Sequence, residues 1–464
     1  MRATRPAVLL LLGGILHAEV LPADTAGVVA PPAPPGLATS EDFTLQVNGQ
    51  PAWVEKLRST FTEKDVPSWF LGPPYTKLPQ QVNIASFSGT GPFSVMLTAS
   101  APIASHAIRP KSRGIRGVVD GRTLRFEIPR PDSLYIEVDA LPALCLFANP
   151  PETGAPKPDD PGVLFFGPGV HRPGTMELKD DQTIYIAGGA VVYGTVSGSP
   201  SRAKIRGRGI LDGSYEGHVV SLANASRVEV EGVLIRNGRQ WTNILTACTD
   251  VAYRNVKVIS FGNSGDGINP VGSSRVTLDG CFLRCTDDCV AIKATRNDQA
   301  VETIRILHST LIGYAFGDGV TIGYETNGPH MKDIQVRNCD ILIARGGSKV
   351  GGHAAFSIIC DGPARISDVS YEDIRVEERV EKLFELHVSD GSHYQKDPPG
   401  HIAGVRLKHV RWEVEKPIVL RGFDDEHRVE DVTFEGCTVA GRKLEGLGDS
   451  VFQVHPHVKD VRFK

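Results

Sequence analysis

A repeated unit of alternating apolar and polar residues dominates the chain. Each unit consists of an alternating strand, a small or polar corner and a second short strand. The units begin at Val228, Val251, Val276, Ile304, Ile334, Val369, Val405 and Val432, with weaker copies at Thr183 and Ala203. From Val228 onward their starting points are 23 to 36 residues apart. Strand-rich units of this length, varied by insertions, are typical of a solenoid. Because neither a 3.6-residue helical spacing nor a leucine-rich-repeat framework is present, the pattern predicts a parallel β-helix over residues 163–464.

Shorter alternating segments precede this repeat, between residues 43 and 150. They read FTLQVNG, FSVMLTAS, TLRFEIPR and SLYIEVDA, and each ends in turn residues. Such segments are typical of an antiparallel β-sandwich. A Pro-rich stretch at residues 150–162 separates this predicted N-terminal domain from the repeat.

The N-terminus has a different pattern. Arg2 and Arg5 precede ten uncharged, mainly apolar residues, and Leu16-His17-Ala18 is similar to a small-residue cleavage site. The apolar run is too short for a bilayer, which needs about 20 residues. We therefore predict that residues 1–18 are a secretory signal peptide, with an uncleaved anchor as the alternative. Residues 19–42, which are rich in proline, are predicted to be a linker. The mature protein is expected outside the cytoplasm, extracellular or periplasmic, and free of the membrane.

Composition narrows the class of partner. The 464 residues include 50 Lys and Arg and 54 Asp and Glu, which gives a net charge of −4 without a basic run. This balance argues against a nucleic-acid partner. The 49 glycines and 32 prolines favour turn-rich β-structure. Eight cysteines occur without a Cys-x2-Cys pair, so no zinc site is expected. Most should be buried, and one bridge among Cys281, Cys285 and Cys289 is an open alternative.

Three aspartates are separated by the length of one coil. Asp266 lies in a Gly-Asp-Gly sequence, and Asp287 and Asp288 follow 21 and 22 residues later. In a parallel coil, residues one period apart stack at strand spacing, about 4.8 Å. Neighbouring carboxylates raise one another's pKa, so one can donate a proton while another accepts one. An acid and a base on either side of a bond are what glycoside hydrolysis requires. Calcium binding and simple turn formation are alternative interpretations of the same residues.

The segment around these aspartates resembles glycoside hydrolase family 28, the polygalacturonase-like enzymes. Ser264-Gly265-Asp266-Gly267-Ile268 is similar to the family's Asn-Thr-Asp-Gly-Ile, and TDDCVAIK at residues 286–293 is similar to its Gly-Asp-Asp-Cys-Ile-Ala-Ile-Lys. NGRQWT at residues 237–242 and GVTIGYETNG at residues 319–328 resemble two further family segments. The similarity covers roughly residues 162–374.

The resemblance implies a pectin-lyase-like, right-handed β-helix and hydrolysis with inversion. It implies that Asp287 is the general acid, and that Asp266 and Asp288 hold and deprotonate the attacking water. Inverting geometry places the carboxyl groups about 6.5–9.5 Å apart. No cofactor and no metal are expected, because carboxylates fill both proton-transfer roles.

Two departures from the family pattern bear on the substrate. Asp318, in Gly317-Asp318-Gly319, stands where the family has a histidine, and His308 or His330 are alternative sources of an imidazole. The family's Arg-Ile-Lys element, which binds a uronate carboxylate, is absent from residues 351–362. The nearby cations are Lys293 and Lys349. A site without the cationic pair should not favour a uronic acid.

Further substrate-binding candidates are Asp318, Lys293, Trp241, Tyr324 and Glu325. The flat faces of Trp241 and Tyr324 suit sugar rings, although core or loop packing explains them equally simply. Glu325 has hydrogen-bonding capacity for hydroxyl groups, and a solvated loop position is its alternative. Lys293 is placed to neutralise the aspartates, or to lie along the surface with its ammonium in water.

Together these features predict an all-β, secreted, monomeric glycosidase that acts on a polysaccharide or its oligosaccharides. A pectic chain is the first expectation. The sandwich ahead of the coil is similar to the layout of family 49, the dextranase and isopullulanase group, so a neutral glucan is an alternative, as is rhamnogalacturonan. A polysaccharide lyase, a non-catalytic carbohydrate-binding β-helix and a structural solenoid are alternatives of other classes. Endo and exo action are both open.

Overall fold

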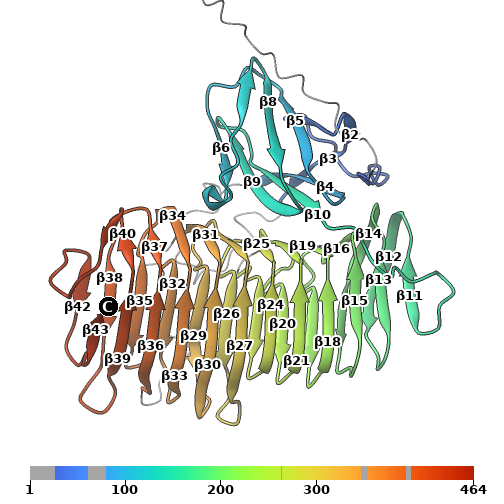
Figure 1. The fold of residues 1–464 in the computed structure, drawn as a ribbon. Coiled ribbons are helices and arrows are strands. Elements are labelled where there is room, and N and C mark those ends of the chain that lie inside the picture. Colours follow the sequence, from blue (N-terminus) through green and yellow to red (C-terminus); the bar gives the residue numbers. More distant parts are fainter. Residues whose placement is uncertain (1–26, 61–79, 263, 346–353, 393–398) are drawn as a thin grey trace, which may run out of the picture.

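The fold is a long β-coil with a small β-domain on one side (Figure 1). The computed structural model describes residues 27–60, 80–262, 264–345, 354–392 and 399–464. The predicted signal peptide, part of the predicted linker and Lys349 lie outside these ranges. The predicted fold class, a right-handed parallel β-helix preceded by a small β-sandwich, is confirmed. In the described ranges, no helix has the length and apolarity that a membrane crossing requires.

The N-terminal domain consists of two five-stranded sheets. The first sheet contains β1 (Phe43–Val47), β2 (Gln50–Ala52), β5 (Phe93–Ala99), β7 (Val118–Asp120) and β8 (Thr123–Ile128). The second contains β3 (Val54–Arg58), β4 (Gln81–Ser88), β6 (His106–Arg109), β9 (Asp132–Val138) and β10 (Leu144–Asn149), with a 3-10 turn at Lys111–Arg113. In β1, burial alternates with the sequence, so that Phe43, Leu45 and Val47 face the other sheet. In β10 all six residues are buried, because its second face lies against the coil.

One side of the coil is a 12-stranded parallel sheet, here called the first face, which runs along its whole length. Its strands are β11 (Val163–Phe166), β13 (Thr183–Ile186), β15 (Lys204–Gly207), β18 (Ser226–Glu231), β21 (Thr249–Arg254), β24 (Ser274–Asp279), β27 (Val301–Leu307), β30 (His330–Arg337), β33 (Arg365–Glu372), β36 (His401–Lys408), β39 (Val429–Glu435) and β43 (Val461–Phe463). The eight residues that open the repeats, from Val228 to Val432, are direct register partners in this sheet. They form one buried column, which is why the repeat was visible in the sequence.

Two further columns of strands complete each coil, and together with β12, β14 and β41 they form a 21-stranded sheet. The column called the docking face contains β16 (Ile210–Asp212), β19 (Leu234–Arg236), β22 (Lys257–Ile259), β25 (Phe282–Cys285), β28 (Thr310–Gly313), β31 (Asp340–Ala344), β34 (Arg375–Val380), β37 (Arg411–Trp412) and β40 (Thr438–Val439). The column called the third face contains β17 (Val220–Ala223), β20 (Asn243–Thr246), β23 (Ile268–Val271), β26 (Val290–Ala294), β29 (Val320–Thr326), β32 (Phe356–Cys360), β35 (Phe384–Val388), β38 (Ile418–Arg421) and β42 (Phe452–Val454). The remaining strands are β12 (Gly169–Glu177), β14 (Ala190–Gly198) and β41 (Arg442–Lys443).

The interior of the coil is a single apolar cluster that runs along its length. It contains seven of the eight cysteines, and the eighth, Cys145, is buried at the domain interface. All eight are free thiols, so the bridge considered among Cys281, Cys285 and Cys289 is not formed.

The sandwich lies against the docking face (Figure 1). Its second sheet and strands β19 to β31 share one apolar cluster, in which the rings of Phe147 and Phe282 meet edge to face with centroids 5.1 Å apart. Beside this cluster, the buried guanidinium of Arg236 donates to Glu55 of the sandwich and to Asp212 of the coil, each at 2.7 Å. Apolar burial and a paired buried charge together fix how the sandwich sits on the coil.

Replacing Phe147 with alanine tests this interface. Phe147 is 1% exposed, so the substitution removes a ring that fills the seam between the domains. We expect Phe147→Ala to lower the free energy of unfolding by about 3–5 kcal/mol, as measured by urea denaturation. Phe423→Ala, at a position 41% exposed, is the control and should change it by less than about 0.5 kcal/mol. Equal effects of the two variants would mean that the interface does not contribute to stability.

Candidate active site

The three predicted aspartates lie at the corner between the docking face and the third face. Ile268, Val290 and Val320 are register partners at the start of β23, β26 and β29. Asp266 and Asp288 precede the first two of these partners by two residues each, so they stack in one column, as the one-coil spacing predicts. Backbone bonds continue this register through the corner, where the N–H of Gly267 donates to the carbonyl oxygen of Asp288 at 2.9 Å.

Glycines beside the aspartates allow the corners to approach one another closely. A Cβ on Gly317 would lie 1.9 Å from the carbonyl carbon of Asp287, and a Cβ on Gly267 would lie 2.4 Å from the carbonyl oxygen of Cys289. Any side chain at these positions would force the coils apart. The Gly-Asp-Gly sequences therefore reflect backbone contact between coils, as well as the need for a carboxylate.

The carboxylates differ in exposure and in hydrogen bonding. Asp287 is half-buried, and its Oδ1 accepts from the backbone N–H of Asp288 at 3.0 Å. Asp288 is 8% exposed, and its Oδ1 accepts from the backbone N–H of Asp318 at 2.7 Å. Asp266 is 3% exposed, and the Nδ2 of Asn269 donates to its Oδ2 at 2.7 Å. Asp287 is thus the most accessible member of the group.

Burial and mutual repulsion perturb the titration of Asp266. Burial raises the pKa of this carboxyl well above its usual range, and the charges of Asp287 and Asp288 raise it further. Lys293 and the hydrogen bond from Asn269 oppose this rise without cancelling it. The column therefore favours retention of a proton at a pH where isolated carboxyls are ionised. A shared proton of this kind suits acid–base catalysis.

Lys293, Glu325 and Trp241 lie together beside the aspartates. The Nζ of Lys293 is 3.0 Å from Oε2 of Glu325 and 5.1 Å from the centroid of the Trp241 ring. Burial by itself lowers the pKa of Lys293, but the charges of Glu325, Asp266 and Asp288 outweigh it, so that the pKa is raised and the ammonium stays charged. The half-buried Trp241 presents a ring next to this cation.

Tyr324 is half-buried in β29. Burial raises the pKa of its phenol well above the usual range, and the charges of Glu385, Asp318, Asp288 and Asp361 add to the effect. The phenol thus lies within the field of the aspartate column and stays protonated, which leaves it a hydrogen-bond donor.

Asp318 lies in a position that differs from the direct substrate contact expected for it. Its side chain is wholly buried; Oδ1 accepts from the N–H of Ala354 at 2.8 Å, and Oδ2 accepts from the hydroxyl of Ser357 at 2.5 Å. The carboxylate therefore joins its own coil to the next one. Through its backbone N–H, Asp318 also orients Asp288.

The two alternative histidines lie at other corners. His308 Nδ1 is 2.7 Å from Asp279 at the corner between the first face and the docking face. His330 Nε2 is 2.6 Å from Glu302 at the start of β30. Neither pairing involves the aspartate column. The imidazole that accompanies the column is that of His218, whose Nδ1 is 2.8 Å from the carbonyl oxygen of Trp241.

His218, Glu385 and Asp361 were not among the residues predicted from the sequence, although the charges of Glu385 and Asp361 act on Tyr324. The register that pairs Val220 with Asn243 places His218 one coil before Trp241 in the same column, a spacing of 23 residues. Glu385 is 3% exposed, and burial raises its pKa, but His387 and Lys382 outweigh this and hold it below its usual range. In the described residues no cluster of three or more His, Cys, Asp or Glu side chains has metal-binding geometry.

Comparisons with known proteins concern the family and the fold of this chain. The model of a family described as "Glycosyl hydrolases family 28" matches residues 174–451. A probable exopolygalacturonase B of Aspergillus terreus is 26% identical over 211 residues, which cover 42% of this chain and 45% of the relative. Exopolygalacturonase B of Aspergillus niger is 24% identical over 165 residues, covering 33% and 35%. The chain thus matches less than half the length of these curated relatives.

The solved structure of Dex49A from Penicillium minioluteum has the same fold. It aligns with a TM-score of 0.66 at 12% identity, over 94% of this chain and 96% of that one. The likeness therefore includes both the sandwich and the coil.

The raised pKa of Asp266 predicts a pH-dependent stability effect. A carboxyl whose pKa is raised by folding lowers stability as the pH increases above its unfolded value of 3.8. We expect Asp266→Asn to increase the free energy of unfolding at pH 7 by about 0.5–2 kcal/mol, and the gain to disappear as the pH falls toward 3.8. Urea denaturation at a series of pH values measures this.

Asp250→Asn is the matched control for this experiment. Asp250 is exposed, and its hydrogen bond with Arg275 lowers its pKa, so its replacement should not stabilise the protein at any pH. A stabilisation by Asp266→Asn that is equal at all pH values would contradict the electrostatic account.

Proposed function

Because the chain belongs to family 28 of the glycosyl hydrolases, we propose that it is an inverting glycosidase whose catalytic groups are Asp287, Asp266 and Asp288. The observation that carries the proposal is the stacking of Asp266 on the Asp287-Asp288 corner, with the pKa of Asp266 raised by burial and by its two neighbours. The signal-peptide pattern of residues 1–18 supports export, and we propose that the exported enzyme acts as a monomer.

In the proposed reaction Asp287 protonates the glycosidic oxygen, since it is the most accessible of the three carboxyls. Asp266 and Asp288 hold a water molecule and accept its proton as it attacks the anomeric carbon from the opposite face. The bond to the leaving sugar breaks as the bond to water forms, which inverts the anomeric configuration.

Several neighbours position these groups. Asp318 acts through its backbone N–H, which orients Asp288, while its carboxylate holds the following coil. Lys293 stabilises the ionised form of Asp266 by charge. Trp241 and Tyr324 offer a ring face and a phenol hydroxyl for the sugar that is bound at the corner.

A pectic chain is the substrate we propose, because the curated relatives are exopolygalacturonases. A neutral sugar chain is the second candidate, and a specific contact favours it. Lys293, the basic group next to the aspartates, is already paired with Glu325 at 3.0 Å. Its charge is therefore less available to a uronate carboxylate, so the candidate site carries a net negative charge.

Hydrolysis of a defined panel tests the proposal. We expect reducing-sugar release from polygalacturonate, with rhamnogalacturonan, dextran and pullulan as the other polymers. Asp287→Asn should lower kcat by roughly 10²–10⁴-fold, because general acid catalysis is lost. Proton NMR of the first product should show the inverted anomer.

Controls separate the rival functions. Asp250→Asn should retain wild-type rates, since Asp250 is paired with Arg275 on the first face. Release from dextran or pullulan alone would replace the pectic substrate with a neutral one. Unsaturated products would show a lyase, and binding without turnover on every polymer would refute the hydrolase.

Replacement of Lys293 is expected to shift the pH dependence of catalysis. Its positive charge lowers the pKa of Asp266, so Lys293→Met should raise that pKa further. Since Asp266 must be ionised to accept a proton, the acidic limb of the kcat/KM profile should move to higher pH. Lys293→Arg keeps the charge and should leave the limb near its wild-type position. An unmoved limb in Lys293→Met would exclude Asp266 as the base.

A further inference from the structure

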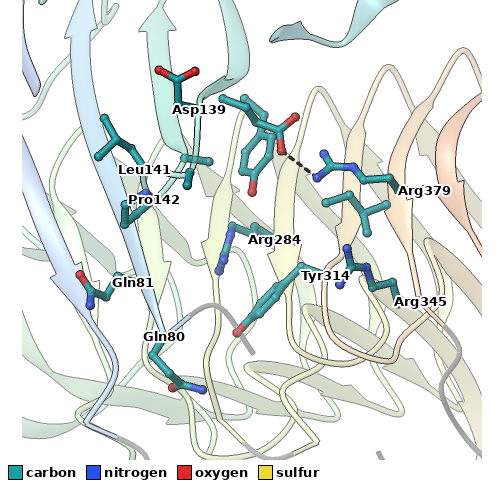
Figure 2. A pocket seen from close by; sticks show the side chains of 14 residues that line it. Gln80, Gln81, Asp139, Leu141, Pro142, Arg284, Tyr314, Arg345 and Arg379 are labelled. Atoms are coloured by element: carbon teal, nitrogen blue, oxygen red, sulfur yellow. Dashed lines mark hydrogen bonds and ion pairs between the residues drawn. The ribbon is translucent and has the colours of Figure 1, made fainter. Parts of the chain in front are cut away.

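A pocket of about 330 Å³ lies at the seam between the sandwich and the coil (Figure 2). Residues 139–143 of the sandwich form one wall, and the docking face forms the other. Arg284 of β25 and Arg379 of β34 belong to one register row, which Ile312 and Ile343 complete. Arg345 directly follows β31. Figure 2 shows the three arginine side chains on the coil side of the pocket.

Arg284 is a buried cation that lacks an anionic partner among the described residues. It is 1% exposed, and its Nε and Nη1 have no hydrogen-bond acceptor within the described ranges. Its guanidinium carbon lies 3.8 Å from the ring centroid of Tyr314 and 5.2 Å from that of Phe261. Ring faces stabilise a cation only in part, and a buried charge without a counter-charge is costly. Arg284 therefore has unused capacity to bind an anion.

The other charges around the pocket leave it positive. Arg379 donates through Nη1 to Glu137 at 2.7 Å, while its Nε and Nη2 have no acceptor in the part of the chain that the structure describes. Glu137 also accepts from Arg109 at 2.8 Å, so its charge is divided between two arginines. The second carboxylate, that of Asp139, accepts from the backbone N–H groups of residues 104 and 105. Guanidinium groups therefore outnumber the carboxylates that could neutralise them.

The uncharged lining indicates what kind of anion fits. Tyr135, Tyr314, Leu141, Pro142 and Ile343 place aromatic and aliphatic surface next to the arginines. Guanidinium forks bind carboxylates in a bidentate manner, and flat apolar surfaces suit the face of a sugar ring. The volume lies within the range of small-ligand pockets, roughly 300–1,000 Å³.

From these observations we propose that the interdomain pocket binds a sugar acid, whose carboxylate pairs with Arg284, Arg379 and Arg345. The site is separate from the aspartate column, although the two are linked. The hydroxyl of Tyr314, which lines the pocket, is 3.3 Å from Oγ1 of Thr286, the residue before Asp287. The ligand is either a free sugar acid or the terminal residue of an acidic chain, and both have the same carboxylate chemistry.

Calorimetric binding of D-galacturonate to the full chain tests the proposal. The Asp287→Asn protein is used so that turnover does not interfere. We expect D-galacturonate to bind, and D-galactose, which lacks the carboxylate, to bind at least tenfold more weakly. Arg345→Ala and Arg379→Gln should each raise the Kd for D-galacturonate at least tenfold. Arg275→Ala, an exposed arginine on the first face, is the matched control and should not change the Kd.

Different binding results would overturn the proposal or identify the ligand. No binding of D-galacturonate, equal binding of D-galactose, or a Kd unchanged in both Arg345→Ala and Arg379→Gln would overturn the proposal. If tri-galacturonate also binds, and its Kd rises in parallel in these two variants, the ligand is the terminus of an acidic chain. Binding of the monomer alone would identify a free sugar acid. Because this experiment measures affinity, a negative result would not contradict the proposed hydrolase activity. Likewise, a lack of hydrolysis would not contradict the proposed binding site.

Discussion

The register between successive parallel coils is the constraint on which this protein depends. A residue in one coil stacks directly on its counterpart in the next, and around the aspartates this converts distances of 22 to 36 residues along the chain into neighbouring positions in space. In the interior the stacking builds a continuous column of Val and Ile. At one corner it builds a column that contains His218, Trp241, Asp266, Asp288 and Asp318. The same regularity that stabilises the coil therefore concentrates charge at the candidate active site.

Such a column is electrostatically unfavourable, and its surroundings limit the repulsion. Lys293 supplies a positive charge, Asn269 donates to Asp266, and the backbone N–H of Asp318 donates to Asp288. These contacts do not remove the perturbation, since the pKa of Asp266 remains well above its usual range. Perturbed carboxyls held at a cost in stability are what acid–base catalysis needs, and the packing of the coils maintains them.

The sandwich adds a second level of organisation. Its sheet covers the docking face through an apolar cluster and the Arg236 ion pairs, so the two domains share one buried interface. This contact also encloses Arg284, which lies beside Tyr135 of the sandwich. Since Tyr314 contacts both Arg284 and Thr286, the seam pocket and the aspartate corner are joined through one side chain.

The sequence by itself determined the fold class and the column of aspartates, because strand alternation and coil period are local properties of the chain. Asp266 and Asp288 could be placed together from their spacing alone. The direction of the Asp318 side chain could not, because Ala354 and Ser357, which bind it, lie 36 and 39 residues later in the sequence. His218 was within reach of the same spacing argument but has no motif of its own. Only the tertiary structure decided that Arg284 is buried without a counter-charge from the described residues, since its surroundings come from two domains whose docking no periodicity encodes.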